Sequence, residues 1–152
     1  MRLMAWAVTV TLTAGLAAGG AGLASAQAPA CQRSEFEAVV DDAAAALRSL
    51  NQSNQPGFQE KLRQLKSKRA WTHDQFMREG VTFVRDEQIA EYDQKSEELL
   101  TGISSKGDAG GQAKSPDCGL LADLRAQMQV LVETQKAKWV YMHDKIGREL
   151  AK

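Results

Sequence analysis

The sequence has no excess of charge of either sign, and it lacks the short motifs that mark common catalytic sites. Its 152 residues include 19 lysines and arginines and 19 aspartates and glutamates. A dedicated nucleic-acid-binding protein would show a strong basic excess, so this balance argues against nucleic acid as a partner. No Gly-x-Ser-x-Gly, His-Glu-x-x-His or phosphate-binding glycine loop occurs. The sequence therefore favours a protein that is not an enzyme.

Residues 1–26 have the composition of a signal peptide. Arg2, the only charged residue of this leader, precedes an uncharged run that ends in the small-x-small pattern Ala24-Ser25-Ala26. An uncleaved membrane anchor is the alternative, because the run is just long enough to span a bilayer, although threonine and glycine dilute it. We expect cleavage after Ala26 and a periplasmic or secreted product without a stable membrane span. Residues 27–152 would then form a single domain with 18 basic and 19 acidic residues.

Cysteine is scarce, with Cys31 and Cys118 as the only two. In an exported protein, two cysteines are expected to form one disulfide. Two free thiols in a reducing compartment are the alternative.

Apolar residues recur at steps of three and four along most of the mature chain, and no segment alternates as a strand does. The periodicity predicts helices over about 35–50, 57–70, 73–103 and 116–150. Ser34–Glu37 and Thr72–Gln75 have the pattern of capping boxes at helix starts. The segment 51–57 is typical of a turn because it is rich in Asn and ends in Pro-Gly, and 104–114 is typical of a flexible glycine-rich loop.

The predicted disulfide restricts the topology of this bundle. Cys31 precedes the first helix and Cys118 lies in the first turn of the last, so a bridge requires both helices to start at the same end. Four full-length antiparallel helices would place these starts at opposite ends and are excluded. The fold class predicted is therefore a small exported all-α bundle of three long helical passes. The first pass is either a bent rod made of 35–50 and 57–70, or 35–50 alone with 57–70 across the far end.

A metal site is one functional hypothesis. If Ile103 faces the neighbourhood of Cys118, antiparallel pairing places His73 near the level of His143 and Met77 near Met142. Imidazole and thioether ligands suit copper, and imidazole with carboxylate suits zinc. Non-covalent haem is a further alternative, since the sequence has no Cys-x-x-Cys-His motif for covalent attachment. The simpler interpretation requires no cofactor: the histidines are solvated residues near helix ends and the methionines fill the core.

A second hypothesis places partner binding on the helix over 57–70. Its outer face is basic and suits an anionic surface or an acidic envelope protein, unless it is simply solvated. Trp71 and Trp139 are core residues or, if exposed, partner anchors. The basic residues are Lys61, Arg63, Lys66, Lys68 and Arg69. Together these features favour a non-catalytic periplasmic adaptor or chaperone-like protein, with copper or zinc binding as the alternative.

Overall fold

The computed structural model describes residues 31–115 and 117–152, and every regular element in them is helical. The predicted signal peptide, residues 1–26, lies outside the described residues. The elements are α1 (Arg33–Lys68), α2 (His73–Gly80), the short 3-10 helix η1 (Val81–Phe83), α3 (Glu87–Gln112) and α4 (Cys118–Ala151). The prediction of an all-α fold is confirmed.

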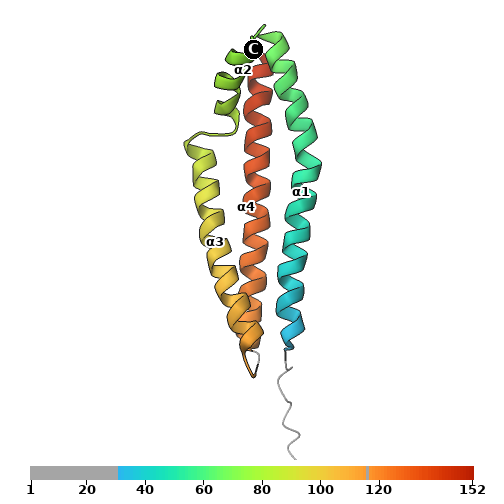
Figure 1. Ribbon diagram of the computed structural model, residues 1–152, viewed down its shortest axis with the longest axis vertical. Helices are drawn as coiled ribbons and strands as arrows, with labels where there is room; N and C mark the ends of the chain where they lie inside the picture. Colours follow the sequence, from blue (N-terminus) through green and yellow to red (C-terminus); the bar gives the residue numbers. More distant parts are fainter. Residues whose placement is uncertain (1–30, 116) are drawn as a thin grey trace, which may run out of the picture.

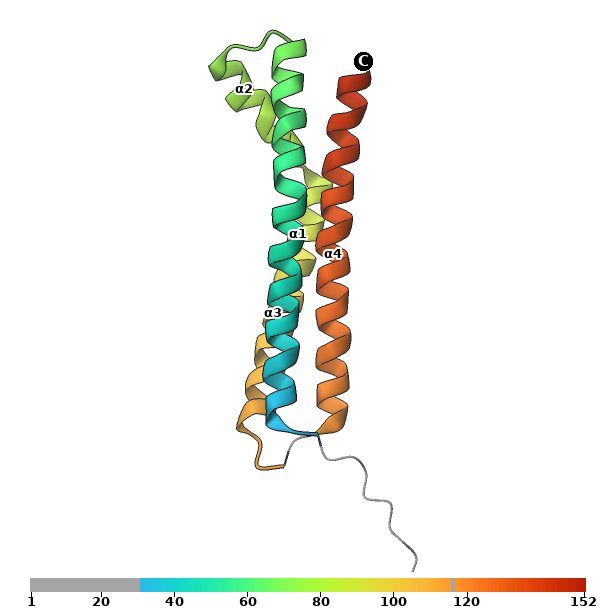
Figure 2. The ribbon, with the colours of Figure 1, turned by 90° about the vertical axis from the view of Figure 1, so that its right-hand side faces the viewer.

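The predicted disulfide and the three-pass topology are also confirmed. Cys31 and Cys118 form a disulfide, with their Cα atoms 5.4 Å apart. In Figure 1, α1 and α4 start at the same end, and α2 and α3 together form the antiparallel return. Figure 2 shows α1 and α4 side by side along nearly their full length. Helix α4 packs extensively against both α1 and α3, and α1 and α3 also contact each other.

The first pass is one continuous helix, so the predicted turn at 51–57 is wrong. Tertiary contacts with α4 override the local turn signal, because the Trp139 indole N–H donates to the Asn51 side chain at 3.0 Å. Phe58 is buried against the same tryptophan ring, which fixes the chain on both sides of Pro56. The predicted capping box at Ser34–Glu37 is also wrong, since α1 starts earlier, with Gln32 as its cap and Glu35 as the reciprocal residue.

The predicted third helix over 73–103 is two helices with a break between them. The capping box of Thr72 and Gln75 starts α2 as predicted. Helix α2 ends at Gly80, and the β-branched residues Val81 and Thr82 that follow lie with Phe83 in the single turn of η1. Asp86 then starts α3, since its carboxylate accepts the backbone N–H of Ile89 at 2.8 Å.

The segment 104–114 is helical as far as Gln112, so the prediction of a flexible glycine-rich loop is wrong. The physical reason is close packing between helices. At Gly110 an added Cβ would lie 2.2 Å from atoms of the Phe36 ring. Glycine is therefore needed here because α3 passes very close to α1, and the residue does not signal a disordered chain.

The buried residues form two clusters along the bundle. One, near the disulfide, includes Phe36, Leu124 and Leu131; the other, at the far end, includes Phe58 and Ile146. A polar layer separates them, in which the Gln135 amide donates to the Ser96 hydroxyl at 2.7 Å. None of the helices in 31–115 and 117–152 combines the length and apolar character needed to cross a lipid bilayer.

Candidate functional site

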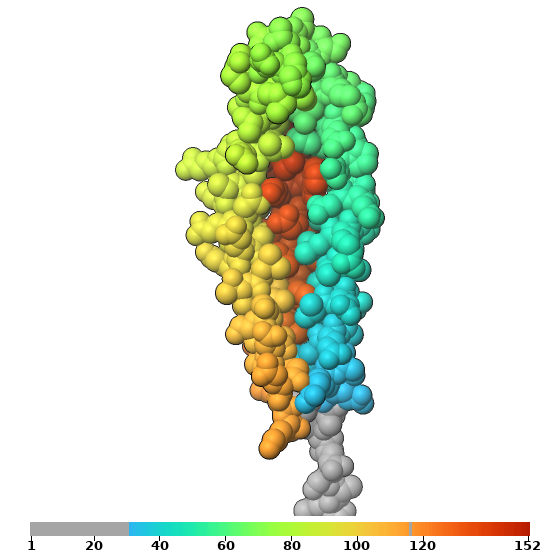
Figure 3. Space-filling view, viewed as in Figure 1, coloured from blue at the N-terminus to red at the C-terminus, as the bar shows by residue number. Residues whose placement is uncertain are grey.

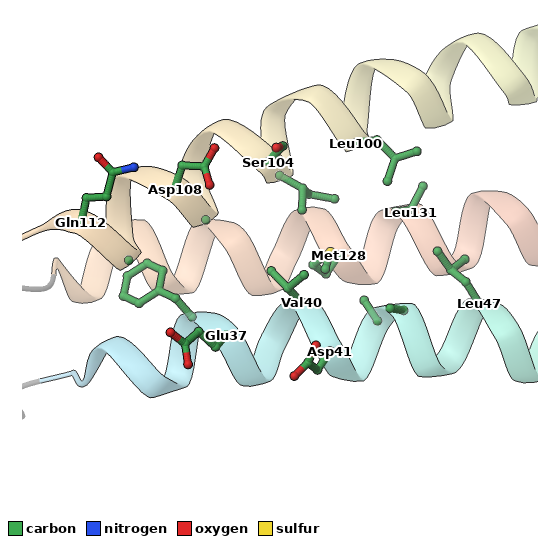
Figure 4. Close-up of a pocket in the computed structure, with 16 residues that line it drawn as sticks. Glu37, Val40, Asp41, Leu47, Leu100, Ser104, Asp108, Gln112, Met128 and Leu131 are labelled. Carbon is green, nitrogen blue, oxygen red and sulfur yellow. The ribbon is translucent and has the colours of Figure 1, made fainter.

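A groove lies between α1 and α3. It holds about 660 Å³, and α4 forms its floor. In Figure 3, α1 and α3 stand apart as two walls, and part of α4 is visible between them. Helix α3 is close to α1 at the disulfide end, where Gly110 meets Phe36, and diverges from it with distance from the disulfide, toward Leu100 (Figure 4).

The interior of the groove is apolar. Met128 and Leu131 of α4 form the floor, and Val40 and Leu47 extend from α1 toward the space that Leu100 enters from α3 (Figure 4). Val40 is 37% exposed and Leu100 is 49% exposed, although both face this groove. Large apolar side chains that remain solvated in a concave site are typical of surfaces that receive a ligand.

The rim of the groove carries negative charge. Glu37 and Asp41 lie on α1 and Asp108 lies on α3, and no lysine, arginine or histidine is among the lining residues. These three carboxylates form no ion pair with any side chain in the described part of the chain. The groove therefore combines an apolar interior with an uncompensated acidic rim.

A cluster of polar contacts lies elsewhere, at the break between η1 and α3. Asp86 accepts hydrogen bonds from the Tyr141 hydroxyl at 2.9 Å and from the Lys145 ammonium group, which also donates to the Thr82 carbonyl. Partial burial raises the pKa of Asp86, but the Lys145 and Ile89 N–H hydrogen bonds outweigh it, and the net pKa is lowered. The Asp86 hydrogen bond is the main cause that raises the pKa of Tyr141. The polar side chains of this cluster bond one another, and they attach the segment between η1 and α3 to α4.

The predicted metal ligands differ in their surroundings. His73 is exposed in the first turn of α2, and Met77 on the same helix is 61% exposed. Met142 is buried in the far core cluster. His143 packs on Phe58 and Trp139, and its burial lowers its pKa.

The register that placed the two histidines at one level is wrong. It would set Asp93 beside Met128, whereas Asp93 pairs with Lys138, farther along α4. The shift arises because α3 continues to Gln112 and does not end at Ile103. Among the described residues, no three His, Cys, Asp or Glu side chains group closely enough to hold a metal ion. Copper or zinc binding by the two histidines and two methionines stays a prediction, but the register no longer supports it.

The five predicted basic partner-binding residues all make contacts within the chain. Three of them connect to α4: Lys61 donates to the His143 carbonyl, Lys68 donates to the Leu150 carbonyl, and Arg69 pairs with Glu149. The other two contact residues of α1 and α2. Arg63 pairs with Glu60, and Lys66 lies 5.3 Å above the centre of the Phe76 ring. The Lys68 ammonium group bonds one of the last carbonyls of α4, that of Leu150, and so stabilises the C-terminal end of this helix.

Trp71 and Trp139 are half-buried and pack against the far core cluster. Neither tryptophan lines the groove. Their role as partner anchors stays a prediction.

The sequence reasoning missed the groove, although one signal for it was present. The neighbouring pairs Val39-Val40 and Leu99-Leu100 each make the apolar face wider than a single contact seam needs. In each pair one residue, Val39 or Leu99, packs against the core cluster, and its neighbour is exposed at the groove.

Comparison of the chain with protein-family models, with curated proteins and with solved structures finds no match in any of the three.

Proposed function

We propose that this protein is an exported, non-catalytic binding protein of the periplasm, an adaptor or chaperone-like protein, whose ligand occupies the groove between α1 and α3. The observation that carries the proposal is the solvated apolar interior of that groove, with Val40 and Leu100 exposed on opposite walls. Covering these side chains would remove apolar surface from water, at roughly 25 cal/mol per Å².

The proposal of export rests on the leader and on the disulfide. Residues 1–26 end in a small-x-small pattern, and a Cys31–Cys118 bridge suits an oxidising compartment. The proposal of no catalysis rests on the lack of a catalytic motif in the sequence.

Binding is tested with the purified, disulfide-bonded protein and the apolar dye N-phenyl-1-naphthylamine, whose fluorescence increases on leaving water. We expect the dye to fluoresce with the native protein, and Val40→Lys to abolish the increase. Val140→Lys is the matched control, because Val140 is an exposed helical valine that does not line the groove. Fluorescence that is the same for both variants and the native protein would exclude the groove as an apolar binding site.

Export is tested separately by expressing residues 1–152 in a bacterial host and sequencing the N-terminus of the recovered protein. Recovery from the periplasm with Gln27 at the N-terminus is the expected result. A cytoplasmic product that retains Met1 and free thiols would contradict export.

A further inference from the structure

We infer that the occupant of the groove is a single amphipathic helix with basic flanks, contributed by another protein. This inference rests on the proposed function, because it names the class of ligand that the same groove takes.

The shape of the groove suits a helix. On α1 its lining runs from Phe36 to Leu47, which corresponds to about three helical turns or roughly 16 Å. Residues 36–47 of α1 and 100–112 of α3 both line the hollow, so it runs parallel to these two helices. A short amphipathic helix that places its apolar side on this groove would complete a four-helix arrangement in this half of the bundle.

The charge of the rim determines which charge the occupant should carry on the sides that face the rim. Glu37 and Asp41 are one turn apart on α1, so their carboxylates follow one edge of the groove, and Asp108 lies on the opposite wall. Because none of these carboxylates is neutralised by a described side chain, the rim favours lysine or arginine on the occupant. The same charge disfavours acidic peptides and anionic lipid surfaces.

Along α1, an apolar residue that faces the groove stands between two acidic residues of the rim. Val40 lies between Glu37 and Asp41 in the sequence and extends into the groove, while the two carboxylates remain exposed beside it. An occupant with apolar residues at steps of three and four and basic residues next to them would meet both features at once.

The inference is tested with two synthetic 14-residue peptides that share one amphipathic leucine pattern. One carries lysine at its polar positions and the other carries glutamate. We expect the Leu/Lys peptide to bind the disulfide-bonded protein at least tenfold more tightly than the Leu/Glu peptide in fluorescence anisotropy at low salt. The affinity of the Leu/Lys peptide should fall as salt is added, because ions screen the rim carboxylates.

Two variants locate this binding on the groove. The triple variant Glu37→Gln, Asp41→Asn, Asp108→Asn should bind the Leu/Lys peptide about tenfold more weakly, since each exposed ion pair contributes modestly. Val40→Lys should abolish binding of this peptide, and Val140→Lys should leave it unchanged. If the triple variant binds the Leu/Lys peptide as tightly as the native protein, the charge argument is overturned.

The outcomes separate this inference from the proposed function. Should the dye or the Leu/Glu peptide bind in a way that Val40→Lys abolishes, while the Leu/Lys peptide does not bind, the groove is an apolar site but its occupant is not a basic helix. If neither peptide nor the dye responds to Val40→Lys, both proposals fail. A dimer in analytical ultracentrifugation that Val40→Lys dissociates would make a second copy of this chain the occupant and would also overturn the inference.

Discussion

Gly110 and Gly111 are neighbours on α3 with opposite surroundings. A Cβ at Gly110 would clash with the Phe36 ring, whereas a Cβ at Gly111 would have no atom within 4 Å. We expect Gly110→Ala to lower the free energy of unfolding by about 2 kcal/mol, because overpacking forces Phe36 or α3 to move. Gly111→Ala should raise it by about 0.5–1 kcal/mol through helix propensity.

Urea denaturation followed by circular dichroism measures both changes. Each variant is the control for the other, because the substitution and the helix are the same. Equal effects on the two would show that α3 does not approach α1 at Gly110.

These two residues also show what composition cannot distinguish. Glycine is enriched in flexible loops and also at close helix contacts, and the sequence 104–114 is the same in either case. Only the position of Phe36 on another helix decides between them, and that position depends on the tertiary fold.

The partly buried imidazole of His143 predicts a pH dependence of stability. Burial is the largest cause that lowers its pKa from about 6.5, and Lys61 lowers it further, while the Asn54 backbone and Asp144 act in the opposite direction. Because the folded state disfavours the protonated imidazole, its contribution to stability is present above about pH 6.5. That contribution is lost as the pH falls through the lowered pKa.

We therefore expect the free energy of unfolding to decrease between pH 7.5 and pH 5, and His143→Gln to reduce this decrease. His73→Gln is the control, since His73 is exposed at the start of α2. A decrease that is equally steep in His143→Gln and in the native protein would assign it to other groups.

At the scale of single elements, Pro56 lies inside α1 and is exposed. It cannot donate the helical hydrogen bond to the residue four positions earlier, and its ring crowds that carbonyl. We expect Pro56→Ala to raise the free energy of unfolding by about 2 kcal/mol, less the small gain that proline gives by restricting the unfolded chain. Thermal denaturation checks this, with the exposed neighbour Gln55→Ala as the control.

A lower stability for Pro56→Ala would mean that α1 needs a local distortion at this position in order to follow α4. Either result concerns the far half of the bundle, because Pro56 lies outside the groove lining.

The elements that could be predicted from the sequence are those with strong signals within a few residues. The capping box of Thr72 and Gln75 is one, and the long apolar periodicity of α4 is another. The continuity of α1 could not be predicted this way. The local preference of 51–57 for a turn is outweighed by Trp139, 88 positions away from its partner Asn51 in the sequence.

At the scale of the whole molecule, one distance constraint was enough to predict the topology. A Cys31–Cys118 bridge requires two helix starts at one end, and this excludes the four-pass arrangement without any knowledge of packing. The register between α3 and α4 was not predictable in the same way, since it depends on where α3 ends. The groove depends on that register and on the divergence of α3 from α1, so it could not be derived from periodicity.

The disulfide should therefore control both the stability of the fold and the groove. It joins residues 87 positions apart, and the loss of loop-closure entropy corresponds to about 4–5 kcal/mol in a model-dependent estimate. We expect Cys31→Ala/Cys118→Ala to lose a stability of this order in urea denaturation.

Dye binding by the same double variant should weaken under conditions where helical content is still retained. The reason is that both walls of the groove begin next to the bridge, at Phe36 on α1 and at Gln112 on α3. A double variant that keeps the native stability and the native dye affinity would show that packing around Phe36 alone holds this end of the bundle together.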